Sequence, residues 1–128
     1  MTMRFGTLTS GAAGADGTDT TGSVSGKLVK IEVLNSTTVK PSDGWDLTVY
    51  TGTVGGNDYD ELFVDLTVSY VNTTIIDYYP VKVAAKAADG SASTLTEVFP
   101  RVFQKEIKLI GANMGNSKSA IVRLIFED

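Results

Sequence analysis

A short acidic stretch near the middle of the chain has the chemistry of a calcium site. It offers hard oxygen ligands within five residues, namely Asn57, Asp58, Asp60 and Glu61. Their spacing does not match the 12-residue EF-hand loop, and acidic residues are common in solvated turns. Asp16 and Asp19 lie in a Gly-rich stretch without the repeated nonapeptide of calcium-binding β-rolls. The sequence therefore predicts turns here and no metal site.

The chain contains no histidine and no cysteine. Histidine is the side chain that most often acts as a general base near neutral pH and as a metal ligand, and cysteine supplies thiolates and disulfides. Ser-His-Asp, Cys-His and zinc chemistry are therefore excluded. A pair of carboxylates of the glycosidase kind is the one familiar template that remains. We predict that the protein is not an enzyme and uses no cofactor.

Several aromatic side chains could stack on sugars or anchor a protein interface. They are Trp45, Tyr50, Tyr59, Tyr70, Tyr78 and Tyr79. Trp45 alternates in phase with Leu47 and Val49, which predicts that it packs in a core. Tyr50, Tyr78 and Tyr79 are the better candidates for exposed contacts.

The composition is that of one acidic domain of 128 residues. Its formal net charge is −4, its isoelectric point is about 4.7, and its 11 basic residues are scattered. A nucleic-acid partner is therefore not expected. We also expect no membrane partner, because no apolar run approaches the roughly 20 residues of a membrane span and the first residues lack the apolar region of a secretory signal.

Alternating apolar and polar residues predict that these side chains sit on β-strands. The run LFVDLTVSY, from Leu62 to Tyr70, sends its odd and even positions to opposite faces. No stretch has the spacing of an amphipathic helix. The other predicted strands are Gly26 to Leu34, with Val29, Ile31 and Val33 on one face, Trp45 to Thr53, Tyr79 to Ala87, Glu106 to Ile110 and Ala120 to Phe126. The predicted fold is an antiparallel, all-β sandwich or jelly roll.

The N-terminal residues 1 to 25 differ from the rest, residues 26 to 128, which form the predicted sandwich. A first strand is expected at residues 3 to 8. Residues 9 to 25 are almost entirely Gly, Ala, Ser, Thr and Asp, and such a stretch cannot bury a core face. We interpret it as a flexible arm or a long loop.

Two hairpins are predicted in the second half of the chain. Asp89-Gly90 separates an outgoing run from a returning run, and the helical alternative for VKVAAKAA is disfavoured by Pro80 and the Val-Lys-Val alternation. The Gly/Asn-rich segment ANMGNSK is expected to join EIKLIG and SAIVRLIFED as a closing hairpin.

The last strand predicts a second apolar face. If Ala120, Val122, Leu124 and Phe126 face the core, then Ile121, Arg123 and Ile125 face away from it. Two isoleucines are not expected to be left to water. A second layer or another subunit should cover them.

In chain order, the most distinctive segments are the MRF start, SGKLVKIEV, GWDLTVYTG, YYPVKVAAKAADG and VFQKEIKLIGANMGNSKSAIVRLIFED. This pattern resembles the small all-β proteins of tailed bacteriophages that decorate or cement the capsid. The resemblance covers nearly the whole chain and rests on strand pattern and turn residues.

The resemblance implies a structural virion protein, made in the host cytoplasm, that clamps neighbouring major capsid subunits on the outside of the head. It also implies a homo-oligomer, with a trimer favoured. The candidate subunit or capsid contacts are Arg4, Phe5, Leu8, Tyr50, Tyr78, Tyr79, Arg101, Ile121, Arg123 and Ile125. A carbohydrate-binding or adhesion module of sandwich form is the alternative function.

Overall fold

The fold is all-β, as predicted. A computed structural model describes residues 1–53, 61–69, 75–80, 82–83 and 97–128. Its strands are β1 (Thr2–Thr9), β2 (Gly17–Thr20), β3 (Val24–Asn35), β4 (Trp45–Thr53), β5 (Glu61–Val68), β6 (Ile76–Tyr78), β7 (Lys82–Val83), β8 (Glu97–Val98), β9 (Arg101–Ala112) and β10 (Ser119–Glu127). The described residues include no helix long and apolar enough to span a membrane.

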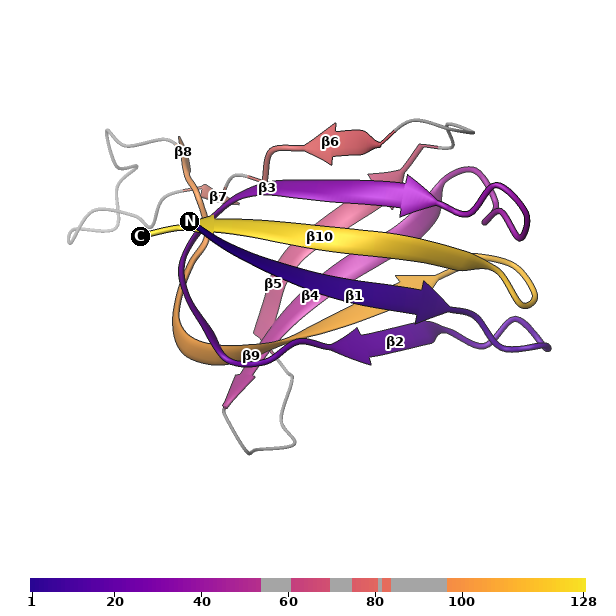
Figure 1. The fold of residues 1–128 in the computed structure, drawn as a ribbon, viewed down its shortest axis with the longest axis horizontal. Coiled ribbons are helices and arrows are strands. Elements are labelled where there is room, and N and C mark those ends of the chain that lie inside the picture. The colour runs from indigo at the N-terminus through magenta and orange to yellow at the C-terminus, as the bar shows by residue number, and fades with distance from the viewer. Residues whose placement is uncertain (54–60, 70–74, 81, 84–96) are drawn as a thin grey trace.

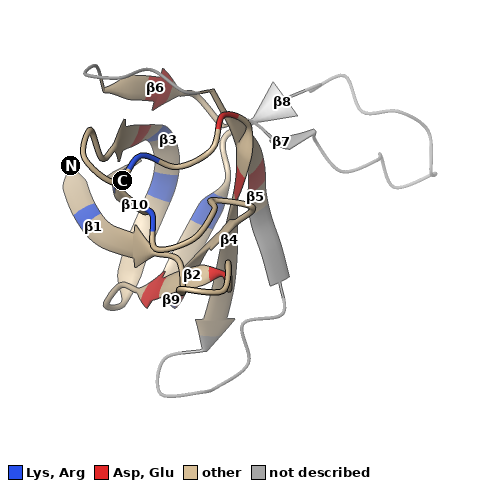
Figure 2. Ribbon diagram, turned by 90° about the vertical axis from the view of Figure 1, so that its right-hand side faces the viewer, with Lys and Arg blue, Asp and Glu red and all other residues tan. Residues whose placement is uncertain are grey.

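Eight of these strands form one antiparallel sheet that folds over into two layers. The first layer has the strand order β1-β10-β3-β6, and the second contains β2, β9, β4 and β5. Strand β9 joins them, because its first residues pair with β3 and its later residues pair with β2 and β4. The first layer lies in front of β4 and β5 in Figure 1, and Figure 2 shows the two layers from the side.

The space between the layers is filled by apolar side chains, as the alternation predicts. In β4, Trp45, Leu47 and Val49 are fully buried. Trp45 also donates a hydrogen bond from Nε1 to Oδ1 of Asn35, at 2.9 Å, inside the core. The other fully buried core side chains include Leu8, Leu28, Ile31, Val33, Ile107, Leu109, Val122, Leu124 and Phe126.

The prediction that Val29 shares a face with Ile31 and Val33 is wrong. A β-bulge lies between the pairs Lys30–Ile125 and Leu28–Phe126, so that one extra residue stands in β3. The extra residue reverses the alternation. Leu28 is therefore fully buried, whereas Val29 is only partly buried.

The N-terminal segment is part of the sheet and not a free arm. Its predicted first strand is confirmed as β1, which pairs with β10 over its whole length. Within residues 9 to 25, β2 pairs with β9. Strand β2 also contacts β1, because the N–H of Thr7 in β1 donates a hydrogen bond of 2.8 Å to Oδ2 of Asp19 in β2. Asp19 thereby satisfies a backbone donor at the sheet edge, where composition alone predicted solvated chain.

The predicted closing hairpin is wrong. Strand β9 pairs with β2, β3 and β4, whereas β10 pairs with β1 and β3. Residues 113 to 118 therefore cross from one layer to the other. The Gly/Asn-rich composition serves this crossing because Asn113, Gly115 and Ser117 all adopt positive φ.

The prediction of a hairpin at Asp89-Gly90 lies outside the described residues. Its base is described, since β7 pairs antiparallel with β8. The predicted strand from Tyr79 to Ala87 begins differently, because β6 ends at Tyr78 and the next strand starts at Lys82. The predicted turn at residues 57 to 60 also lies outside the described part of the chain.

Candidate interaction face

The side of the first layer that points away from the core forms three cross-strand rows. One row pairs Met3, Ile125 and Lys30, and another pairs Thr7, Ile121 and Leu34. The middle row runs across all four strands and consists of Phe5, Arg123, Glu32 and Asp77. We call this surface, together with the flanking Ile75 and Tyr79, the outer face.

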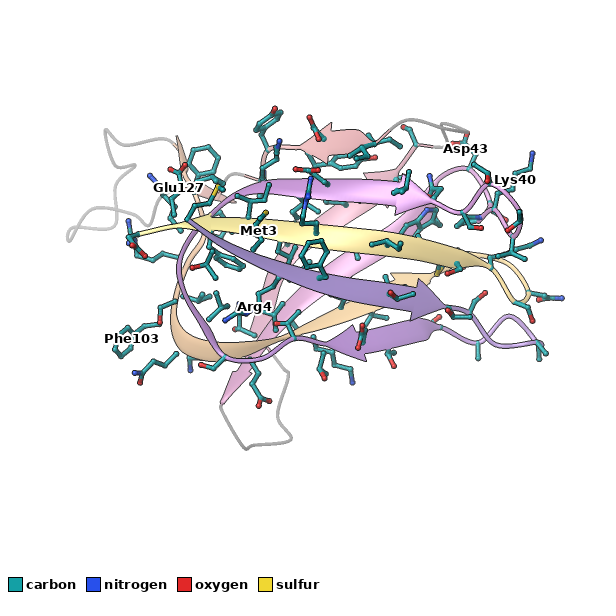
Figure 3. The ribbon with its side chains drawn as sticks, in the orientation of Figure 1. Met3, Arg4, Lys40, Asp43, Phe103 and Glu127 are labelled. Carbon is teal, nitrogen blue, oxygen red and sulfur yellow. The ribbon has the colours of Figure 1, made fainter. Side chains whose placement is uncertain are left out.

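The outer face exposes a group of large apolar side chains. Phe5 is 58% exposed, Ile75 47%, Ile121 45%, Met3 41% and Leu34 37%. In Figure 3 the viewer looks onto this layer, with Met3 labelled. Exposed apolar side chains that lie singly need no explanation, but a group on one sheet face marks an interaction surface.

A network of ion pairs lies at the centre of this apolar surface. Arg123 donates a hydrogen bond from Nη2 to Oε2 of Glu32. Lys30 Nζ lies 3.2 Å from Oε1 of Glu32 and 4.0 Å from Oδ2 of Asp77. Lys30 thus stands between two carboxylates that the register places opposite each other, where like charges would otherwise destabilise the pairing.

Glu32 is buried, at 7% exposure, although it lies on the outer side of the sheet. The hydrogen bond from Arg123 lowers the pKa of the Glu32 carboxyl below its ordinary value of 4.5, burial opposes this by raising it, and the Lys30 contact lowers it again. The Arg123 guanidinium also lies 5.8 Å from the centre of the Phe5 ring, within the range of a cation–π contact. Glu32 is therefore held ionised among apolar neighbours.

A small hollow opens on the outer face beside Phe5. Its volume is about 150 Å³. It is lined by Phe5, Glu32, Leu34, Ile75, Ile121 and Arg123. A wider, more polar hollow of about 400 Å³ lies next to it and shares Leu34 and Ile121. The first hollow has mostly apolar walls and an ion pair at one side, which suits a side chain from a protein partner.

The structure places some of the predicted contact residues on the outer face and others away from it. Phe5, Ile121 and Arg123 come together on the outer face, as the alternation in β10 predicts. Leu8 is fully buried in the core, because it lies three residues from Phe5 and therefore points to the opposite face of β1. Ile125 is only 8% exposed, although it lies on the same side of the sheet as its cross-strand neighbours Met3 and Lys30.

The other predicted contacts do not lie on one surface. Tyr78 is half-buried and packs against the core, and its hydroxyl accepts a hydrogen bond of 3.1 Å from the Ser69 N–H. Its neighbour Tyr79 points the other way and is 65% exposed. Tyr50 is half-buried on β4, in the second layer. These three tyrosines therefore do not form the platform that a stacked sugar would need.

Two of the three predicted arginine contacts, Arg4 and Arg101, lie away from the centre of the outer face. Arg4 is half-buried and donates a hydrogen bond of 3.0 Å from Nη2 to the carbonyl of Ser23, so it ties β1 to the segment before β3. Arg101 is exposed at the start of β9. Neither side chain lines the hollow beside Phe5.

Sequence reasoning missed three of the residues that line the hollow, Glu32, Leu34 and Ile75. Leu34 follows Lys30 and Glu32 at the same alternation, so extending the β3 pattern by one step would have placed it outward. Ile75 gives no such signal, because it precedes a strand of only three residues. Its position depends on the pairing of β6 with β3, which the sequence does not reveal.

The described residues contain no group of three or more acidic side chains placed to hold a metal ion. No family model, curated protein or solved structure matches this chain. The chemistry of the outer face is therefore known only from the residues of this chain.

We expect the Glu32 ion pair to make stability depend on acid pH. Because the pKa of Glu32 is lowered in the folded state, its stabilising contribution is present above about pH 4.5 and is lost as the pH falls through the folded-state pKa. Glu32→Gln should therefore be less stable than the parent near neutral pH, and this difference should shrink in acid. Urea unfolding of both proteins at about pH 7 and about pH 3 measures it.

Asp16→Asn, which removes one exposed carboxylate from the segment just before β2, controls for the change in net charge. A Glu32→Gln difference of the same size at both pH values would show that the ionised carboxylate is not what stabilises this face.

Proposed function

We propose that this protein is a structural virion protein that decorates the outside of a phage capsid and binds its major capsid protein. The observation that carries the proposal is the outer face, with its exposed apolar side chains around a buried ion pair. Such a surface suits a lasting protein contact, in which aromatic and arginine side chains are the usual anchors. In this proposal the chain has no catalytic role.

The folded N-terminal segment supports a clamp of this kind. A clamp must transmit force between neighbouring subunits without unfolding, and here β1 is paired with β10 along its length and contacts β2 through Asp19. A repeating capsid lattice offers many identical sites. An oligomer that binds several of them at once gains affinity without any additional contact.

The test is co-sedimentation of the purified protein with phage heads that lack it, from the phage whose genome encodes the chain. We expect saturable binding with a fixed number of copies per head, and no binding to a glycan array. Glycan retention without head binding would instead support the carbohydrate-binding alternative. Failure to bind heads at micromolar concentration would overturn the proposal.

A further inference from the structure

We propose that the outer face takes one aromatic side chain from an uncharged, apolar part of its capsid partner, with the ring seated in the hollow beside Phe5. This inference rests on the proposed function and deepens it, because it names the chemistry of the surface that the outer face binds. The features that carry it are the size and lining of the hollow and the pairing of the charges around it.

The hollow beside Phe5 has the size and lining of a site for one ring. An apolar cavity of about 150 Å³ holds a molecule the size of benzene, and this hollow has about that volume. Its aliphatic walls are Leu34, Ile75 and Ile121. Each of these side chains is at least 37% exposed, so each has apolar surface that an incoming side chain can bury.

Two further walls of the hollow favour an aromatic ring over an aliphatic side chain. Phe5 gives an incoming ring an aromatic partner, and aromatic pairs gain more than the burial of area alone when they pack offset or edge to face. Arg123 also lines the hollow, and a guanidinium group is attracted to the face of an aromatic ring. A leucine side chain in the same place would gain neither interaction.

The charges of the outer face need no charge from the partner. The described charged residues on this face are two cations, Lys30 and Arg123, and two anions, Glu32 and Asp77. Ion pairs join them to one another. A charge brought by the partner would be buried without a counter-ion, which is costly, whereas an uncharged partner surface leaves every pair intact. The outer face therefore fits an uncharged surface.

An apolar contact of this kind predicts that binding to phage heads resists salt. Contacts between exposed charges weaken as added salt screens them, whereas the burial of apolar surface does not depend on screening. The dissociation constant from co-sedimentation should rise by no more than about threefold between about 50 mM and about 500 mM NaCl. A larger rise would show that charges on the partner hold the contact, and would overturn the inference.

The ring itself is tested without phage heads, by titrating N-acetyl-phenylalanine amide into the isotope-labelled, full-length chain and following the backbone amide signals by NMR. The shifts should cluster at residues that line the hollow, such as Leu34 and Ile121, with a dissociation constant on the order of millimolar. N-acetyl-leucine amide should bind at least about threefold more weakly. Equal binding of the two probes, or the absence of shifts at the hollow, would contradict the inference.

Two variants connect the probe site to the head contact. Phe5→Ala removes the aromatic wall of the hollow, and Ile121→Asp places an unpaired charge in an aliphatic wall. Because both residues are exposed, both variants should stay folded by circular dichroism. Each should lose the probe-induced shifts and should weaken head binding by at least about tenfold. Head binding that survives both substitutions unchanged would also overturn the inference.

Phe103→Ala is the matched control. Phe103 is 73% exposed but projects from the end of the molecule on β9, away from the outer face (Figure 3). This variant should bind the probe and the phage heads as the parent does. An equal loss in Phe103→Ala and Phe5→Ala would show that the ring does not enter the hollow beside Phe5.

Failure of this inference is distinguishable from failure of the proposed function. Head binding that is steeply salt-dependent, or that does not need Phe5 and Ile121, would contradict this inference alone. Probe binding at the hollow of a chain that binds no phage heads would contradict capsid decoration alone.

Discussion

Trp45→Ala should lower the free energy of unfolding by about 3 to 5 kcal/mol, the usual cost of truncating a large buried aromatic side chain. Trp45 is fully buried between the layers, and its truncation also leaves the Asn35 amide oxygen without its donor. Domains of this kind are stable by only about 5 to 15 kcal/mol. The variant should therefore unfold at a much lower urea concentration than the parent.

Tyr79→Ala is the control for Trp45→Ala, since it removes an aromatic side chain that is 65% exposed. It should change the free energy of unfolding by less than about 0.5 kcal/mol. Equal losses for the two variants would mean that Trp45 does not occupy the core position described above.

Gly26→Ala should also be strongly destabilising, for a backbone reason. Gly26 has a φ of +130°, and a Cβ atom there would lie 2.8 Å from the carbonyl oxygen of Glu127. A side chain at such a φ costs about 1 to 3 kcal/mol, and the close backbone contact adds to this cost. Gly26 lies where β3 shifts register against β9. We therefore expect this register shift to be lost in Gly26→Ala. Urea unfolding measures the change.

Gly22→Ala is the matched control, because a Cβ atom there would meet nothing within 4 Å. Alanine at such a position stabilises a protein by about 0.4 to 1 kcal/mol through the unfolded chain. If Gly26→Ala behaved like Gly22→Ala, the described geometry at the β3–β9 crossing would be incorrect.

Local alternation predicted most of what depends on a single strand. Trp45, Leu47 and Val49 were placed in the core, and Ile121 and Arg123 were placed outside it, because side chains on a strand alternate with a period of two. The same rule failed at Val29, where the bulge depends on the partner strand β10. A single sequence carries no signal for an extra residue opposite another strand.

Features that depend on which strands pair could not be predicted. The segment ANMGNSK has the composition of a hairpin turn, yet the same residues serve a crossing between layers, because both need positive φ. Likewise, the small residues of 9 to 25 read as solvated, although Gly17 packs against the backbone of Thr9 as β2 passes β1. Small side chains permit close approach as readily as they permit a turn.

The candidate site was predicted in part for the same reason. Phe5, Ile121 and Arg123 were named, but Phe5 was grouped with Leu8, although the two lie on opposite faces of β1. The ion pair of Arg123 with Glu32 joins residues on β10 and β3. This ion pair could therefore be found only from the register of β10 and β3. The hollow depends in addition on Ile75, next to β6.

The most direct measurement of the central claim is a cryo-electron microscopy reconstruction of phage heads that carry the protein. We predict density for the chain on the outside of the head, with Phe5 and Ile121 covered by the major capsid protein. A head surface without this density, or bound chains whose Phe5 and Ile121 face solvent, would contradict the account.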